Sequence, residues 1–234
     1  MCGQCLRKNS GSNDYKVSLK REESLSGRGR AEYEKEPPVS SGDLSEFERV
    51  FLECHNKYRA RHKVQHFVWS DKLTAKARKW AIHLVAESRR NGDTNLLAGQ
   101  SGSEKSGLGQ TCCTISAMTK PTPSSMAERV CGQWYETGEH FAVGNNAVNP
   151  QAAAFTQMVW RDSKRVGACL MWQGQQALIV AFYFPPGNVE NEFGGNVSKV
   201  MRTPRPARRR VEVDSPLSSP GVSLTPPSFN RLDR

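Results

Sequence analysis

The sequence predicts an α+β fold. Three stretches with helical apolar spacing come first, and two apolar runs rich in β-branched and aromatic residues come last. Because strands and helices do not alternate along the chain, a doubly wound parallel sheet is excluded. Residues 45–197 hold all five tryptophans, so we expect one folded core in this part of the chain.

The first helix is predicted from its apolar spacing and its start signal. Phe47, Phe51 and Tyr58 recur at intervals that place them on one helical face. Either Asp43 or Ser45 can cap the start, since both side chains accept hydrogen bonds from free backbone N–H groups. The folded core is therefore expected to begin near Asp43.

A second helix is predicted from about Ser70 to Gly92, followed by a long loop. The apolar stripe of this helix consists of Leu73, Ala77, Trp80, Ala81 and Leu84. Glycine readily adopts the left-handed conformation that ends a helix, which places the stop at Gly92. Residues 99–123 are rich in Gly, Ser and Thr, and we expect a loop that carries the adjacent Cys112 and Cys113.

A third helix and a hairpin complete the predicted core. Ser125 and Glu128 form a capping-box pattern, and Gly138 is expected to end the helix. Residues 152–160 are compatible with a short further helix. Residues 166–172 and 177–184 are predicted to be antiparallel strands joined by a turn at 173–176.

Composition divides the chain into three parts. Residues 1–42 and 201–234 are polar and rich in Ser, Pro and charged residues, which predicts disordered tails on either side of a domain over 43–200. The formal net charge is +10, and residues 198–234 contribute eight basic and three acidic groups to it. The basic C-terminal tail suggests an anionic partner.

The cysteines and the start of the chain favour the cytosol. The seven cysteines are odd in number and include an adjacent pair, which is not typical of a secreted disulfide framework. Residues 1–8 contain no apolar signal segment, and no run approaches the roughly 20 apolar residues of a membrane span. A secreted protein with a different start remains the alternative.

Four short motifs follow one another along the predicted core. Residues 55–59 are His-Asn-Lys-Tyr-Arg, 134–136 are Trp-Tyr-Glu, 155–160 are Phe-Thr-Gln-Met-Val-Trp, and 182–188 are Phe-Tyr-Phe-Pro-Pro-Gly-Asn. In this order they resemble the motifs of the CAP superfamily of cysteine-rich secretory, antigen 5 and pathogenesis-related proteins. The resemblance implies a three-layer α–β–α sandwich over about residues 45–197. The chain is most similar to the Golgi-associated plant pathogenesis-related branch of this family. That similarity implies a location on the cytosolic face of Golgi membranes.

The resemblance also implies where the family's metal-binding cleft would lie. That cleft gathers two histidines and two glutamates, and the four positions fall at Gly92, Thr94, Thr137 and Ala154 in this chain. Without imidazoles, a zinc site or a general acid–base pair has no basis. We therefore expect a degenerate cleft with no metal, no cofactor and no catalytic residues.

Glu136 and His140 are the residual polar candidates near that cleft. Their spacing of four residues would place them on one face of a helix. Gly138 lies between them, however, and an exposed helix end is the favoured interpretation. A hydrolase with a rearranged cleft that uses this pair is retained as an alternative function. His55 is expected to serve a structural hydrogen bond.

The two tails supply the other candidate functional residues. Cys2 and Cys5 could carry acyl chains, and two chains give a stable membrane anchor. The basic cluster of the C-terminal tail would be attracted to anionic lipid headgroups. It consists of Arg202, Arg205, Arg208, Arg209 and Arg210. Nucleic acid is a less favoured partner because the tail lacks interleaved aromatic residues.

These observations lead to one main hypothesis and two alternatives. The main hypothesis is a non-catalytic CAP module, peripheral on Golgi or other cytosolic membrane surfaces, that binds anionic lipids or proteins. Dimers occur in the family, so the resemblance also implies a homodimer. The alternatives are the rearranged hydrolase and an extracellular, defence-type CAP protein.

Overall fold

The computed structural model describes residues 15–17, 27–92, 96–97, 107–142, 144 and 146–198. Within them, five strands form one sheet in the order β1-β3-β5-β4-β2. The strands are β1 (Tyr15–Val17), β2 (Val68–Trp69), β3 (Gly109–Ser116), β4 (Arg165–Gln173) and β5 (Gln176–Phe184). All neighbours are antiparallel except β2 and β4. The predicted hairpin is confirmed as β4 and β5.

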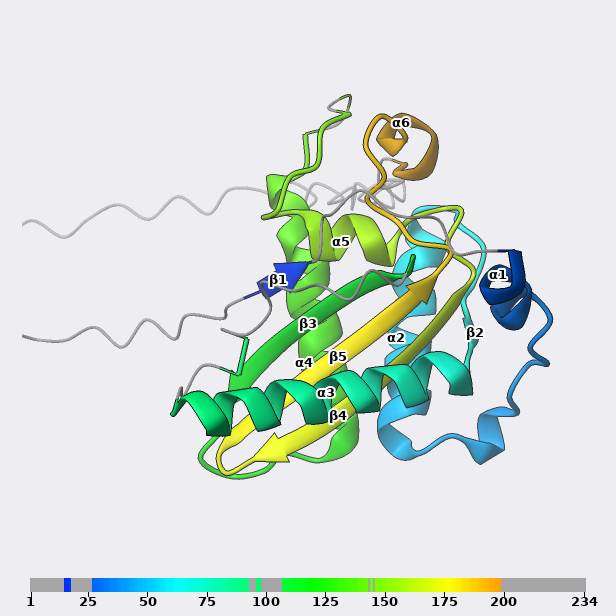
Figure 1. The fold of residues 1–234 in the computed structure, drawn as a ribbon. Coiled ribbons are helices and arrows are strands. Elements are labelled where there is room, and N and C mark those ends of the chain that lie inside the picture. The colour runs from blue at the N-terminus through cyan, green and yellow to red at the C-terminus, as the bar shows by residue number, and fades with distance from the viewer. Residues whose placement is uncertain are drawn as a thin grey trace, which may run out of the picture. The chain divides into compact units, whose positions relative to one another are not determined.

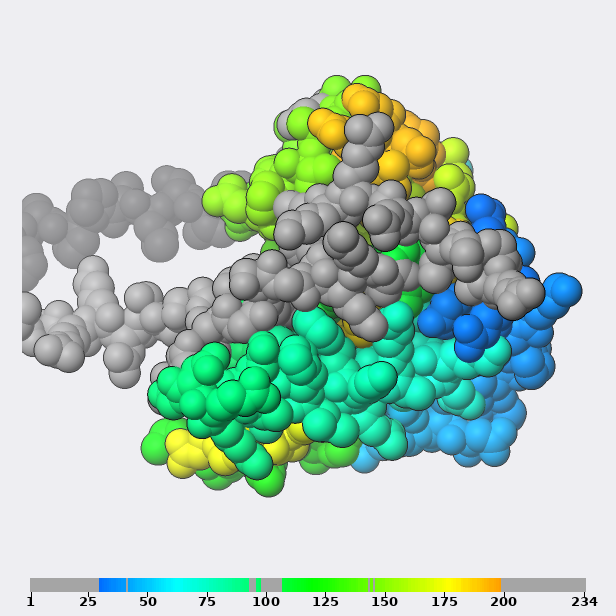
Figure 2. All heavy atoms as spheres, viewed as in Figure 1, coloured from blue at the N-terminus to red at the C-terminus, as the bar shows by residue number. Residues whose placement is uncertain are grey.

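Helices cover both faces of this sheet (Figure 1). Helix α3 (Asp71–Asn91) lies on one face, and α2 (Glu46–Arg61), α4 (Pro123–Glu136) and α5 (Ala153–Met158) lie on the other. The shorter elements are α1 (Gly27–Glu34), η1 (Ser41–Asp43), η3 (Thr137–His140) and α6 (Phe193–Asn196). The layers confirm the α+β prediction. Figure 2 shows the outer surface of α3 exposed along the viewed side.

Side chains alternate along the strands into two separate cores. Cys113 on β3 and Tyr183 on β5 join the core beneath α2, α4 and α5. Cys112 and Phe182, one residue away in each strand, join the core beneath α3. Successive side chains of a strand point to opposite faces, so a sheet covered on both sides needs apolar residues at both.

The helix ends follow the local sequence, with one correction. Ser45 caps α2 and forms a capping box with Glu48, and the left-handed Gly92 (φ 64°) ends α3. The start of α4 was predicted at Ser125, which is wrong. Thr122 is the cap, and its side chain accepts a hydrogen bond from Ser125 N. Pro123 then begins the helix because its fixed φ suits the first turn.

The prediction of a loop over 99–123 is wrong for its second half. Residues 109–116 form β3, a central strand that pairs with both β1 and β5. Its Gly, Gln, Cys and Ser residues add little strand propensity to that of Thr111, Thr114 and Ile115, but burial on both faces and two neighbouring strands stabilise it. Cys112 and Cys113 are buried on opposite faces of this strand, so they do not lie in an open loop.

The N-terminal boundary at residue 43 also requires correction. Tyr33, at the end of α1, packs its ring 5.2 Å from that of Phe184. Glu36 is buried and accepts hydrogen bonds from Lys72 N and from the Ser70 hydroxyl. Residues 30–42 therefore belong to the folded domain. Composition missed them because a few anchored side chains hold an otherwise polar segment.

A close approach between β4 and α3 requires glycine at position 167. A Cβ atom there would lie 2.4 Å from Thr74 N and 2.6 Å from Ser70 O, both backbone atoms. Gly167→Ala is expected to lower the free energy of unfolding by about 1–3 kcal/mol, since backbone cannot move aside as a side chain can. Urea unfolding monitored by circular dichroism measures the change.

Gly195→Ala provides the matched control, because nothing lies within 4 Å of a Cβ at that exposed position. Equal stability of the two alanine variants would contradict the close approach of β4 to α3.

Candidate functional site

The first candidate position lies where α4 ends. Thr137 is buried, and its hydroxyl donates to Trp134 O at 2.7 Å. The same hydroxyl accepts a hydrogen bond from Phe155 N at 3.1 Å. The hydroxyl thus both donates to and accepts from backbone groups, and Thr137 links the end of α4 to α5.

Ala154 directly precedes Phe155, whose backbone N–H bonds to Thr137. Its side chain is buried in the core shared by α2, α4 and α5. The ring of the next residue, Phe155, packs over Gly138, where a Cβ would come within 2.8 Å of the ring. The structure thus brings two of the four positions, Thr137 and Ala154, together, and apolar atoms and satisfied backbone groups surround them.

The other two positions of the predicted cleft are Gly92 and Thr94. Gly92 ends α3 in the left-handed conformation, and nothing lies within 4 Å of a Cβ built there. Thr94 lies outside the described residues. Among the residues that the structure describes, no three His, Cys, Asp or Glu side chains come together as metal ligands.

Glu136 and His140 do not form a pair in the described structure. Helix α4 ends at Glu136, and a 3-10 turn carries the chain from Thr137 to His140. A 3-10 turn has about three residues per turn, so a spacing of four no longer aligns two side chains. Exposed His140 instead contacts Glu139, with 3.4 Å between Nε2 and Oε1.

His62 also lies near Phe155, and the sequence alone did not indicate its position. Its ring lies edge-on to those of Tyr135 and Phe155, at 5.8 and 5.4 Å. Nδ1 contacts Ser198 O at 2.7 Å and Nε2 contacts the Tyr135 hydroxyl at 3.1 Å. Burial lowers the pKa of His62, which favours the neutral ring. His62 therefore ties the end of α2 to the segment after α6.

His55 occupies a second buried network, as expected of a structural histidine. Nδ1 lies 2.9 Å from Phe51 O, and Nε2 lies 3.1 Å from the Tyr183 hydroxyl. The carbonyl can only accept, so Nδ1 carries the proton and Nε2 accepts from Tyr183. Desolvation lowers the pKa of His55 to about 3. The ring is neutral at physiological pH and joins α2 to β5.

Arg59 is the charged centre of the fold. Its guanidinium donates to four carbonyl oxygens and lies 3.7 Å from the centre of the Phe67 ring. The acceptors are Gln65 O, Met158 O, Trp160 O and Ser163 O, at 2.6 to 3.0 Å. Burial lowers the pKa of Arg59 to about 9. Arg59, on α2, therefore holds the last part of the 155–160 motif in place.

The closing motif at residues 182–188 is bound to the same helix α5. Asn188, with a left-handed φ of 58°, donates to Ala153 O and accepts from the Thr156 hydroxyl. Gln157 accepts from Gly187 N and donates to the Ser163 hydroxyl. Several of the residues that carry the family resemblance thus bond to one another.

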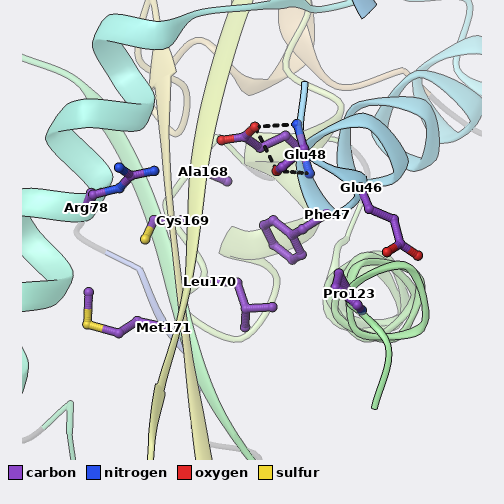
Figure 3. A pocket seen from close by; sticks show the side chains of 10 residues that line it. Glu46, Phe47, Glu48, Arg78, Pro123, Ala168, Cys169, Leu170 and Met171 are labelled. Carbon is purple, nitrogen blue, oxygen red and sulfur yellow. Dashed lines mark hydrogen bonds between the residues drawn. The ribbon is translucent and has the colours of Figure 1, made fainter. Parts of the chain in front are cut away.

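The described residues contain a pocket elsewhere, of about 370 Å³ (Figure 3). It lies beside β4, between the first turns of α2 and α4 and residue Arg78 of α3. Its lining consists of residues 45–48, 78, 123 and 168–171. Gly92, Thr137 and Ala154, the described positions of the predicted cleft, do not line it.

Comparison with known proteins identifies the fold and family. Residues 52–183 match the model of the cysteine-rich secretory protein family, CAP. The chain belongs to the CAP family. The structure of Na-ASP-1 shares the fold, with a TM-score of 0.50, 18% identity, and coverage of 67% of this chain and 45% of that one.

Curated relatives of this CAP chain are distant. Human Golgi-associated plant pathogenesis-related protein 1 is 24% identical, over 63% of this chain and 88% of its own. Tobacco pathogenesis-related protein 1C is 30% identical, over 59% and 75%. SCP domain-containing protein 1 of Lottia gigantea is 25% identical over 63% of this chain, which spans only 40% of that protein.

The predicted tail sites lie outside the described residues. These are the acylation candidates Cys2 and Cys5, and the basic cluster Arg202, Arg205, Arg208, Arg209 and Arg210. No described helix of this CAP chain is long and apolar enough to cross a membrane.

Proposed function

We propose that this CAP chain is a non-catalytic module that associates peripherally with cytosolic membrane surfaces, where it binds anionic lipids or proteins. The main support is the hydrogen bonding of Thr137. Its hydroxyl bonds to Trp134 O and Phe155 N, at a position where the family resemblance places a glutamate. Ala154, in place of a histidine, is enclosed by the core. Neither side chain supplies the carboxylate or the imidazole that the family's site would use.

Two observations support the membrane part of the proposal. One relative is described as Golgi-associated. The C-terminal tail carries five arginines between residues 202 and 210, and each basic group near an anionic leaflet contributes about 1 kcal/mol of attraction. Acylation of Cys2 and Cys5 would supply the second signal that stable attachment requires. A homodimer is part of the same proposal, and nucleic acid is not a proposed partner.

Vesicle flotation tests the electrostatic contribution. The full chain is expected to float with vesicles of phosphatidylcholine and phosphatidylserine. Replacing Arg202, Arg205, Arg208, Arg209 and Arg210 with glutamine should reduce this partitioning by up to about a thousandfold, at about 1 kcal/mol each. Raising the salt concentration should reduce the binding of the unaltered chain in the same way.

The matched control removes five positive charges from the domain surface. The exposed residues Lys57, Lys63, Lys79, Lys120 and Lys164 are replaced with glutamine. Equal flotation of both variants would refute a specific role for the arginine cluster. In cells, Cys2→Ser with Cys5→Ser should move the protein to the soluble fraction, and an unchanged membrane fraction would refute acylation.

A further inference from the structure

The far edge of the sheet, along β4, is open for most of its length. β2 pairs only with Arg165 and Val166, and no strand among the described residues pairs with the remainder of that edge. Val68 N donates to Lys164 O, and Ser70 N donates to Val166 O. Backbone groups alternate in direction along a strand. The N–H and C=O groups of Leu170 and Trp172 therefore point outward at this edge.

The open part of β4 itself carries no charge, proline or bulge that would prevent further pairing. Residues 168–172 are Ala-Cys-Leu-Met-Trp, without a charge or a proline. The register with β5 is continuous from Arg165 to Gln173, so no bulge interrupts the strand. Leu170, Met171 and Trp172 are only half-buried. Natural proteins usually protect such an edge, and an apolar, regular one is a template for another strand.

The pocket described above lies along this edge, and its two walls differ in chemistry (Figure 3). On the side of α3, Arg78 lies with Cys169 and Met171. On the other side, Phe47 and Leu170 form an apolar wall with Pro123. The Glu48 carboxylate lies beside Ala168, where it accepts hydrogen bonds from Ser45. Its volume is at the lower end of the range for ligand sites, roughly 300–1,000 Å³.

The helices on either side of the open edge of β4 limit what can bind there. The open part of β4 is recessed between α3 on one side and the starts of α2 and α4 on the other. The edge of a second copy is recessed in the same way, so two such edges could not approach each other. A single extended segment can enter. Its alternate side chains would face Arg78 on one side and Phe47 and Leu170 on the other.

We propose that the open edge of β4 binds an extended peptide, in which acidic and apolar residues alternate, as an added strand. The acidic side chains face Arg78, and the apolar side chains lie against Phe47 and Leu170. This site is independent of the membrane attachment proposed above.

Fluorescence anisotropy with the full chain tests this site. The probe is fluorescein-labelled Val-Glu-Val-Glu-Val-amide, with Val-Lys-Val-Lys-Val-amide as its charge-reversed counterpart. The acidic peptide is expected to bind and the basic one to bind at least tenfold more weakly. Methylation of the three central backbone nitrogens should abolish binding, because it removes donors to β4 and leaves the side chains in place.

Arg78→Gln should weaken binding of the acidic peptide about tenfold, the effect of one charged hydrogen bond. The control, Lys79→Gln, removes a neighbouring exposed charge that does not line the pocket and should leave binding unchanged. Equal effects of the two variants, or undiminished binding of the methylated peptide, would overturn the proposal. Absence of measurable binding of the acidic peptide to the full chain would also overturn it.

Discussion

Replacing Arg59 with methionine is expected to lower the free energy of unfolding by about 3–5 kcal/mol. Methionine has a similar length but no donor, so four carbonyl oxygens that now accept from the guanidinium lose their partner. Buried carbonyls without a donor destabilise the folded state more than the lost bonds alone. The midpoint of urea unfolding measures this effect.

Arg61→Met is the matched control for that experiment. Arg61 lies one half-turn away on α2, is exposed, and makes only ring contacts with Tyr58 and Tyr135. Its replacement should change stability by less than about 0.5 kcal/mol. A similar midpoint for both variants would show that Arg59 does not hold the 155–160 segment in place.

Acid is expected to destabilise the fold through His55, by about 4–5 kcal/mol between neutral pH and pH 3. The pKa of His55 is about 3 in the fold and 6.5 in the unfolded chain. Between these values the unfolded chain binds the additional proton, so stability rises with pH. The contribution is complete above pH 6.5 and decreases by up to about 1.4 kcal/mol per unit as the pH falls toward 3.

Urea unfolding at a series of pH values, for the unaltered chain and for His55→Gln, measures this dependence. The variant should be less stable at pH 7, because it disturbs the bonds to Phe51 and Tyr183, but should lose stability less steeply below pH 6.5. His66→Gln alters an exposed histidine and should leave the slope unchanged. The same slope in the His55 variant and the unaltered chain would assign the acid sensitivity to other groups.

The elements with strong local signals were predictable. The stripe and the glycine stop of α3 gave its bounds closely, from Asp71 to Asn91. The β4–β5 hairpin was recognisable because both strands are rich in β-branched and aromatic residues. Strand β3 was missed because it lies within a segment rich in Gly, Ser and Thr, and because its two paired neighbours, β1 and β5, are distant in sequence.

The candidate site was predictable only where the family motifs reach it. The motifs placed Thr137 and Ala154 beside each other in the structure, through Phe155. His62 carried no local signal, since its contacts with Tyr135 and Ser198 span 73 and 136 residues. The pocket along β4 likewise depends on four segments distant in sequence.

The bonds of Thr137 have a consequence for how this branch of the family can change. A glutamate at that position would break the link from α4 to Phe155, and an imidazole at position 154 would have to enter a filled core. A chain with a glutamate at position 137 and a histidine at position 154 is therefore expected to be less stable than this one.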